Sequence, residues 1–193
     1  MLASRALIAG REHIPASGGC FLAVNHTHYL DVVMVMVGST RPVRWLSMTQ
    51  VSQGKWRWFM ELIGTIPLRR GKVDAKAARD LLQAVRGGDV AGVFPEARIR
   101  RGSDRMTHGG TVDDSLCRLA RTASVPVLPC VVAGCEHFAN WQDWLPFSRT
   151  RWAVVFGPLL PPETVTPDTL TATMRRLYWT ASHHAYPSKN DTP

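Results

Sequence analysis

The sequence predicts an α/β fold in which a mostly parallel central sheet is flanked by helices. Short apolar runs of strand length recur along the chain, segments with helical spacing separate them, and Gly, Pro or Asn residues bound several of the runs. The chain has 193 residues, of which 45% are hydrophobic, so it can bury one sizeable core. We therefore expect residues 1–193 to form a single domain.

Seven apolar runs predict the strands of this sheet. They are Ala6–Ile8, Cys20–Val24, Val43–Ser47, Thr65–Leu68, Val90–Phe94, Val127–Ala133 and Ala153–Phe156. Five segments between them predict helices, namely Asp31–Val37, Gln53–Ile63, Asp74–Arg86, Thr111–Thr122 and Thr169–Ser182. The clearest is Asp74–Arg86, where apolar residues form one stripe and Gly87-Gly88 ends the helix. Strands thus alternate with helices, which is the order expected of a parallel sheet.

The charge balance favours anionic partners. The formal net charge is +8, from 23 Lys and Arg against 15 Asp and Glu. Nucleic acid, phosphorylated substrates and an anionic membrane face all fit this charge. The chain has no zinc-finger spacing, no aromatic RNA-binding strand and no basic-region helix, which argues against nucleic acid.

Cysteine usage and hydropathy indicate a cytoplasmic protein. The four cysteines lie at irregular intervals without the spacing of a zinc site, so reduced thiols are expected. Residues 1–10 lack the apolar core of a secretory signal, and the longest clearly apolar run, Val32–Val37, is far short of the roughly 20 residues that span a bilayer. We expect any membrane contact to be peripheral and on the inner face.

The residues that follow the strands are the first candidates for function, because ligands of open α/β sheets bind at the carboxyl ends of the strands. The run Cys20–Val24 is followed by Asn25-His26-Thr27-His28-Tyr29-Leu30-Asp31. A carboxylate at Asp31 could fix the imidazole tautomer of His26 and leave its other nitrogen free to take a proton from a hydroxyl. A loop histidine and a helix-capping aspartate would give the same spacing without catalysis.

Two further strand ends carry charged residues. Thr65–Leu68 leads into Arg69 and Arg70, whose guanidinium groups are suited to bidentate phosphate binding. Val90–Phe94 leads into Pro95-Glu96-Ala97-Arg98, where Glu96 could orient a substrate hydroxyl or hold Arg98 for a phosphate. A solvated arginine pair and a structural ion-pair cluster are the simpler interpretations of these two segments.

Taken together and in this order, the motifs resemble those of the glycerolipid acyltransferase family, which includes the lysophosphatidic acid acyltransferases. Asn25-His26-x₄-Asp31 is similar to the family's first block and Gly64–Arg70 to its second. Phe94-Pro95-Glu96 resembles its third block and Val125–Pro129 its fourth, so the resemblance covers roughly residues 10–134. It implies a glycerol-3-phosphate acyltransferase-like fold.

The resemblance also implies a reaction and its residues. His26 would deprotonate the acceptor hydroxyl of a lysophospholipid such as lysophosphatidate, which attacks the acyl thioester of coenzyme A or acyl carrier protein. Asp31 would orient His26, Arg70 would bind the acceptor phosphate, Glu96 would help to position the acceptor, and Arg98 would be a second anion contact. No metal or other cofactor is implied, since the thioester is a co-substrate.

The third block departs from the common FPEG pattern. Ala97 stands where the family has a glycine, a residue that permits a positive φ and close contact with the backbone. With a one-residue deletion, Phe94-Pro95-Glu96-Ala97-Arg98-Ile99 resembles the FPEGRI variant of bacterial lysophospholipid acyltransferases. This departure leaves the acceptor open.

Two classes of hydrolase fit the sequence less well. His26-x-His28-x-x-Asp31 invites a metal-dependent hydrolase, but the carboxylate falls one residue too late and Val32 follows it where a histidine is required. No Gly-x-Ser-x-Gly elbow of a serine hydrolase occurs. A catalytically altered, peripheral lipid-binding member of the family is the remaining alternative.

The aromatic and cationic segment 55–60 favours a membrane interface, although its helical spacing also suits core packing.

Overall fold

The computed structural model describes residues 5–48, 58, 65–68, 75–100, 102–139 and 150–187. Within these ranges, seven strands form one sheet. They are β1 (Arg5–Ala9), β2 (Cys20–Val24), β3 (Val43–Met48), β4 (Ile66–Leu68), β5 (Val90–Val93), β6 (Val127–Ala133) and β7 (Arg151–Phe156). The helices are α1 (Asp31–Gly38), α4 (Ala75–Arg86), α5 (Ser115–Ala123) and α6 (Pro167–Ala185). Four short 3-10 helices are η1 (Arg11–His13), η2 (Gly102–Asp104), η3 (Met106–His108) and η4 (Cys135–Ala139).

The sheet is mostly parallel, as the sequence predicts. Its strand order is β1-β7-β6-β2-β5-β3-β4, and β6 with β7 is the antiparallel pair among the described strands. β2 lies in the interior between β6 and β5, so the loop that follows it opens in the middle of the sheet. All five residues of β2 are buried, which explains why this strand reads as a continuous apolar run.

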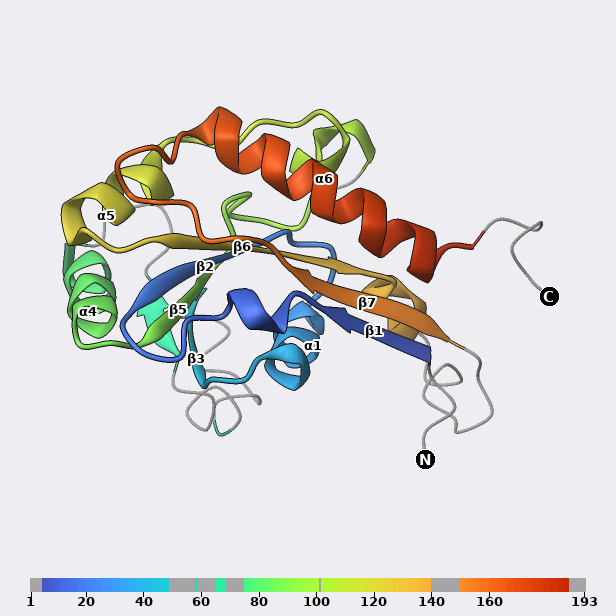
Figure 1. Cartoon of the computed structure of the whole chain (residues 1–193), viewed down its shortest axis with the longest axis horizontal. Helices are drawn as coiled ribbons and strands as arrows, with labels where there is room; N and C mark the ends of the chain where they lie inside the picture. Colours follow the sequence, from blue (N-terminus) through green and yellow to red (C-terminus); the bar gives the residue numbers. More distant parts are fainter. Residues whose placement is uncertain are drawn as a thin grey trace.

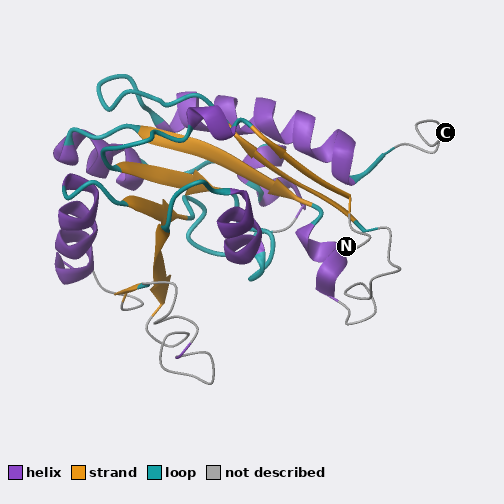
Figure 2. Cartoon of the chain, turned by 60° about the horizontal axis from the view of Figure 1, so that its bottom comes forward, coloured by secondary structure: helices purple, strands orange, loops and turns teal. Residues whose placement is uncertain are grey.

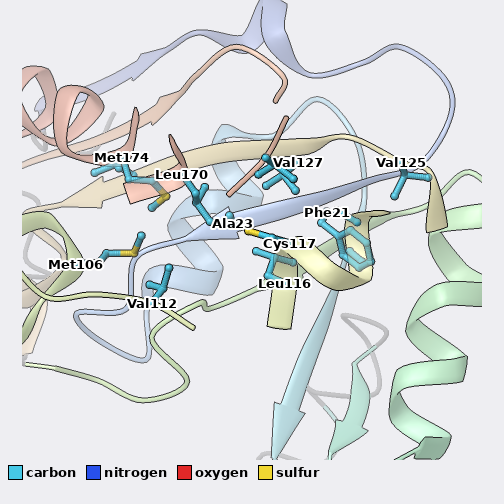
Figure 3. Close-up of a cluster of buried hydrophobic side chains, with 14 of the residues drawn as sticks. Phe21, Ala23, Met106, Val112, Leu116, Cys117, Val125, Val127, Leu170 and Met174 are labelled. Carbon is cyan, nitrogen blue, oxygen red and sulfur yellow. The ribbon is translucent and has the colours of Figure 1, made fainter. Parts of the chain in front are cut away.

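Helices cover both faces of the sheet (Figure 1), as the two buried clusters require. One cluster joins the sheet to α4, α5 and α6, and Figure 3 shows Phe21 and Ala23 of β2 within it. The other cluster joins the opposite face to α1 through Met34 and Val35. In Figure 2 the sheet lies between these layers. Alternate residues of β2 therefore serve two cores.

Element boundaries agree with the sequence predictions to within two residues except at two helices. The predicted helix over Thr111–Thr122 begins only at Ser115, because the Asp113 carboxylate accepts a hydrogen bond from the Ser115 N–H at 2.8 Å and closes a turn before the helix. α6 begins earlier and ends later than Thr169–Ser182, since Thr166 caps it in a reciprocal pair with Thr169. The predicted helix over Gln53–Ile63 falls outside the described residues, apart from Trp58.

None of the described helices has the length and apolar character needed to cross a bilayer.

Candidate active site

The register of the sheet brings the two motif loops together. Ala23 of β2 pairs with Val93 of β5 in parallel. His26 lies three residues beyond the first of these and Glu96 three residues beyond the second. Parallel strands end at the same edge of a sheet, so these loops, distant in sequence, leave the sheet side by side.

His26 and Asp31 form a hydrogen-bonded pair. The Nδ1 atom of His26 lies 3.1 Å from Oδ2 of Asp31. Because a carboxylate only accepts hydrogen bonds, Nδ1 carries the proton and Nε2 keeps its lone pair. The His26 side chain is 19% exposed while that of Asp31 is fully buried. The pair can therefore present a base to a hydroxyl while its orienting carboxylate is shielded from solvent.

The loop itself is folded around the Asp31 carboxylate. Oδ2 accepts the main-chain N–H groups of Thr27 at 2.7 Å and His28 at 2.8 Å, and Oδ1 accepts the Thr27 hydroxyl at 3.0 Å. A carboxylate at the first residue of α1 thus ties down the N–H groups that precede the helix. This network fixes the main chain of the loop next to His26, and hence the point from which the His26 side chain extends.

Asn25 holds the start of the same loop to the neighbouring strand. Its side-chain amide donates to the Val132 carbonyl at 2.9 Å, and its side-chain oxygen accepts the Val132 N–H at 2.8 Å. Val132 lies in β6 beyond the last β2–β6 pair, Val24 with Cys130. The Asn25 side chain therefore continues the ladder where the main chain of β2 has turned away.

Glu96 ties the second motif loop to the first. Its Oε2 accepts the main-chain N–H of His26 at 2.8 Å, and its Oε1 accepts the main-chain N–H of Met106, also at 2.8 Å. Glu96 is buried, 1% exposed. Each carboxylate oxygen is thus occupied by a main-chain donor, and the contact that Glu96 makes with the first motif loop is to the backbone of His26.

Aromatic rings stack behind His26. The Phe94 ring lies 4.0 Å from the His26 ring, centroid to centroid, with 21° between their planes. Trp45 of β3 also stacks with Phe94, with ring centroids 5.2 Å apart. Gly92 makes room for this arrangement, because a Cβ atom there would lie 2.6 Å from the Trp45 ring. Stacking fixes the plane of the imidazole, as the Asp31 bond fixes its tautomer.

The predicted site residues fall into three groups. His26, Asp31 and Glu96 are brought together, and Arg98 lies exposed on the loop that Glu96 anchors. Arg70 lies outside the described residues. Sequence reasoning gave no role to Phe94 or Asn25, although both stand within the quoted motifs.

The thiols are buried and protonated. Burial raises the pKa of Cys20 to about 11, against a lowering influence of Arg41. Burial is also the first cause of the raised pKa values of Cys117, Cys130 and Cys135. All four cysteines are free and buried in the structure. A thiol nucleophile is therefore disfavoured in this protein.

His28 lies in the same loop as His26 and Asp31. Its Nδ1 accepts the main-chain N–H of Leu30 at 3.4 Å, and its ring centroid is 3.9 Å from that of Tyr29. In the described part of the chain, no group of three or more His, Cys, Asp or Glu side chains is arranged to hold a metal ion.

Comparison with known proteins identifies relatives. A family model described as Acyltransferase matches residues 5–133, more than half of the chain. The 1-acyl-sn-glycerol-3-phosphate acyltransferase of Bacillus subtilis (strain 168) is 22% identical over 129 residues, which are 66% of this chain and 62% of that protein. The chain therefore spans less than two thirds of the length of this curated relative.

A solved structure shares the fold. The crystal structure of the 1-acyl-sn-glycerophosphate (LPA) acyltransferase PlsC from Thermotoga maritima matches with a TM-score of 0.70 and 19% sequence identity. The match covers 93% of this chain and 73% of that one. The expected glycerolipid acyltransferase-like architecture is confirmed.

Proposed function

Because this chain belongs to the acyltransferase family, we propose that it moves a fatty acyl group from a thioester onto a hydroxyl of a lysophospholipid such as lysophosphatidate. The observation that carries the proposal is the hydrogen-bonded pair of His26 and Asp31, which leaves one imidazole nitrogen free to accept a proton. The B. subtilis relative, named for transfer to 1-acyl-sn-glycerol-3-phosphate, supports an acceptor of this class.

The proposed reaction is a direct transfer. Nε2 of His26 takes the proton of the acceptor hydroxyl as the oxygen attacks the thioester carbonyl carbon. The new C–O bond forms, the C–S bond breaks, and the imidazolium returns the proton to the departing thiolate. Asp31 stabilises the imidazolium between these two proton transfers. Since the buried thiols are protonated, no acyl-cysteine intermediate is invoked.

Cationic residues at the rim would bind the substrates' anionic groups. Arg98 is exposed on the loop next to Glu96, a position that supports contact with the acceptor phosphate. Arg70 stays a prediction for the same phosphate. Glu96 would position the acceptor through the loops that it holds, since each of its oxygens already accepts a main-chain N–H. The donor is acyl-CoA or acyl carrier protein, used as co-substrate without a further cofactor.

Because the proposed acceptor is a membrane lipid, we expect the protein to act at the membrane surface, on its cytoplasmic face. Four exposed apolar side chains support such contact: Tyr29, Val33, Met36 and Val37, in and just before α1. Tyr29 lies within the loop that carries His26, and the other three follow it in α1. A peripheral protein with its active-site helix at the lipid interface would take its acceptor without extracting it fully into water.

The activity can be tested with purified protein. Acyl-CoA and acyl carrier protein donors are screened against a panel of lysolipids, with products read by mass spectrometry. Replacing His26 by Ala should lower the rate by roughly 10²–10⁴-fold, the usual contribution of a positioned general base. His183→Ala, which changes an exposed histidine of α6, is the matched control and should leave the rate unchanged.

Other outcomes would point elsewhere. Acyl transfer unchanged in His26→Ala would remove the catalytic assignment. Lipid binding without transfer for any donor and acceptor pair would favour a catalytically altered lipid-binding protein. Chelator-sensitive hydrolysis with stoichiometric zinc would favour the metal-dependent hydrolase.

A further inference from the structure

The C-terminal helix α6 reaches the catalytic histidine through a continuous line of hydrogen bonds. Arg175 of α6 donates from Nε to the Met106 carbonyl at 3.0 Å and from an Nη atom to the Gly110 carbonyl at 3.3 Å. The main-chain N–H of Met106 donates in turn to Glu96, which also holds the N–H of His26. One residue, Met106, is thus held from both sides.

Two residues of the segment 102–110 pack closely against their surroundings, namely Met106 and Gly110. The Met106 side chain is fully buried in the core cluster that also contains Leu170 and Met174 of α6 (Figure 3). Gly110 folds back so closely that a Cβ atom there would lie 2.0 Å from the Asp104 carbonyl oxygen. Because the Met106 side chain is enclosed by the core, a shift of its main chain would also have to move the neighbours of that side chain, which packed interiors resist.

The geometry points to Arg175 as a positioning residue for the reaction: by fixing the main chain of Met106, it fixes Glu96 and hence the backbone of His26. The inference rests on the proposed function, since it concerns the base of that reaction. It goes beyond the family match, which ends at residue 133 and does not include α6. The Arg175 guanidinium group donates to the main chain of Met106 and Gly110, so the proposed action is through the two motif loops.

Kinetics of acyl transfer separate positioning from a purely structural role. Arg175→Met keeps the apolar stem and removes the guanidinium group. We expect kcat to fall by roughly 10- to 100-fold, the cost of a misplaced catalytic group, with unchanged KM for donor and acceptor. Arg175→Lys keeps one charged donor and should recover part of the loss. Arg176→Met is the matched control, because the neighbouring Arg176 contacts Thr173 of its own helix, and should behave as wild type.

A double-mutant cycle tests the route. If Arg175 acts through Glu96, then Arg175→Met should cost less than about threefold in a Glu96→Gln background, because linked residues are not additive. Equal losses in both backgrounds would overturn the proposal. So would an unchanged kcat, or an acceptor KM that rises while kcat holds, which would make Arg175 a substrate contact. Should Arg175→Met fail to fold, Arg175→Lys is taken through the same cycle; its smaller loss of kcat should likewise shrink in the Glu96→Gln background.

A readout without catalysis keeps the two proposals apart. The imidazole resonances of His26, assigned by their loss in His26→Ala, should shift in Arg175→Met and stay in place in Arg176→Met. These shifts can be measured even if no donor and acceptor pair gives acyl transfer. A failure of the proposed function is therefore distinguishable from a failure of Arg175 to position His26. Unshifted His26 resonances in Arg175→Met would overturn the proposal that Arg175 positions His26.

Discussion

Ala97 holds its main chain at a φ of +56°, in the left-handed region that favours glycine. It directly follows Glu96, and its own N–H donates to the Phe94 carbonyl at 2.9 Å, closing the turn. The strained residue therefore sits in the turn that aims Glu96 at the backbone of His26. The glycine common at this position in the resembled family has a physical reason in this chain too.

Ala97→Gly should stabilise the protein. A left-handed conformation costs a non-glycine residue about 1–2 kcal/mol, and the greater freedom of glycine in the unfolded chain offsets part of the gain. We expect the free energy of unfolding to rise by about 0.5–1 kcal/mol, measured by urea denaturation.

The same exchange elsewhere gives the opposite sign. Ala172 is exposed within α6, where glycine is a poor helix former, so Ala172→Gly should lower the free energy of unfolding by about 1 kcal/mol. Ala97→Gly behaving like Ala172→Gly would show that the positive φ carries no strain.

Among the described elements, α1 is the helix whose composition departs most from that of a surface helix. Beyond Asp31 it contains only Val, Met and Gly, yet Val37 is 57% exposed, and Tyr29 just before the helix is 66% exposed. A helix that is apolar all round is normally buried on every side. Because α1 begins at Asp31 of the candidate site, we expect its exposed apolar face to be the one that contacts lipid.

Liposome sedimentation tests this role of α1. Replacing both Val33 and Val37 by Glu should weaken binding to anionic vesicles at every salt concentration, because it removes apolar surface and adds repulsion. Trp179→Glu is the control: Trp179 is 66% exposed on α6, on the opposite side of the sheet from α1 (Figure 1). It should leave binding unchanged.

Salt separates the electrostatic part of the attraction. Binding of the wild type should weaken as salt rises, because charges are screened over about 10 Å at 0.1 M and about 3 Å at 1 M. If the protein bound neutral vesicles as strongly as anionic ones at all salt concentrations, the +8 net charge would have no role in the attraction. Unchanged vesicle binding by the variant that carries both Val33→Glu and Val37→Glu would show that α1 does not contribute to membrane contact.

Sequence patterns predicted the elements well where burial is two-sided or periodicity is long. β2 and β6 coincide with their predicted runs because buried parallel strands are apolar throughout. The start of α5 was wrong because Val112 is a core residue placed on a loop, and hydrophobicity alone cannot separate the two. The start of α6 was missed although Thr166-Pro167 carries a cap and an N-terminal proline.

The candidate site was partly predictable for a similar reason. His26 and Asp31 are five residues apart, so local geometry joins them, and Glu96 joins them through the rule that parallel strands end at one edge. Arg175 lies 69 residues from Met106 and shows no periodic or motif signal. Its contact depends on how α6 crosses the sheet, which is a tertiary property.

At the scale of the whole molecule, the matched family region ends inside the sheet. Residue 133 is the last of β6, and both β7 and α6 follow it. β7 joins β1 to the rest of the sheet, since it pairs with β1 on one side and β6 on the other. The fold that holds the candidate site therefore depends on residues that carry none of the family's motifs.

A fragment ending at residue 139 should consequently fail to fold cooperatively. It leaves β1 without its described partner and uncovers both buried clusters, because Phe156 lies in one of them and Leu170 and Met174 in the other. Burial of each such side chain contributes about 1.5–3 kcal/mol, so their loss alone approaches the 5–15 kcal/mol that usually stabilises a domain. Circular dichroism during urea titration should show a gradual transition for this fragment and a sharp one for a chain ending at Pro187, which keeps every described element. A sharp transition and a native-like spectrum for the shorter fragment would mean that the first six strands fold independently, and α6 would then be an addition to a finished domain.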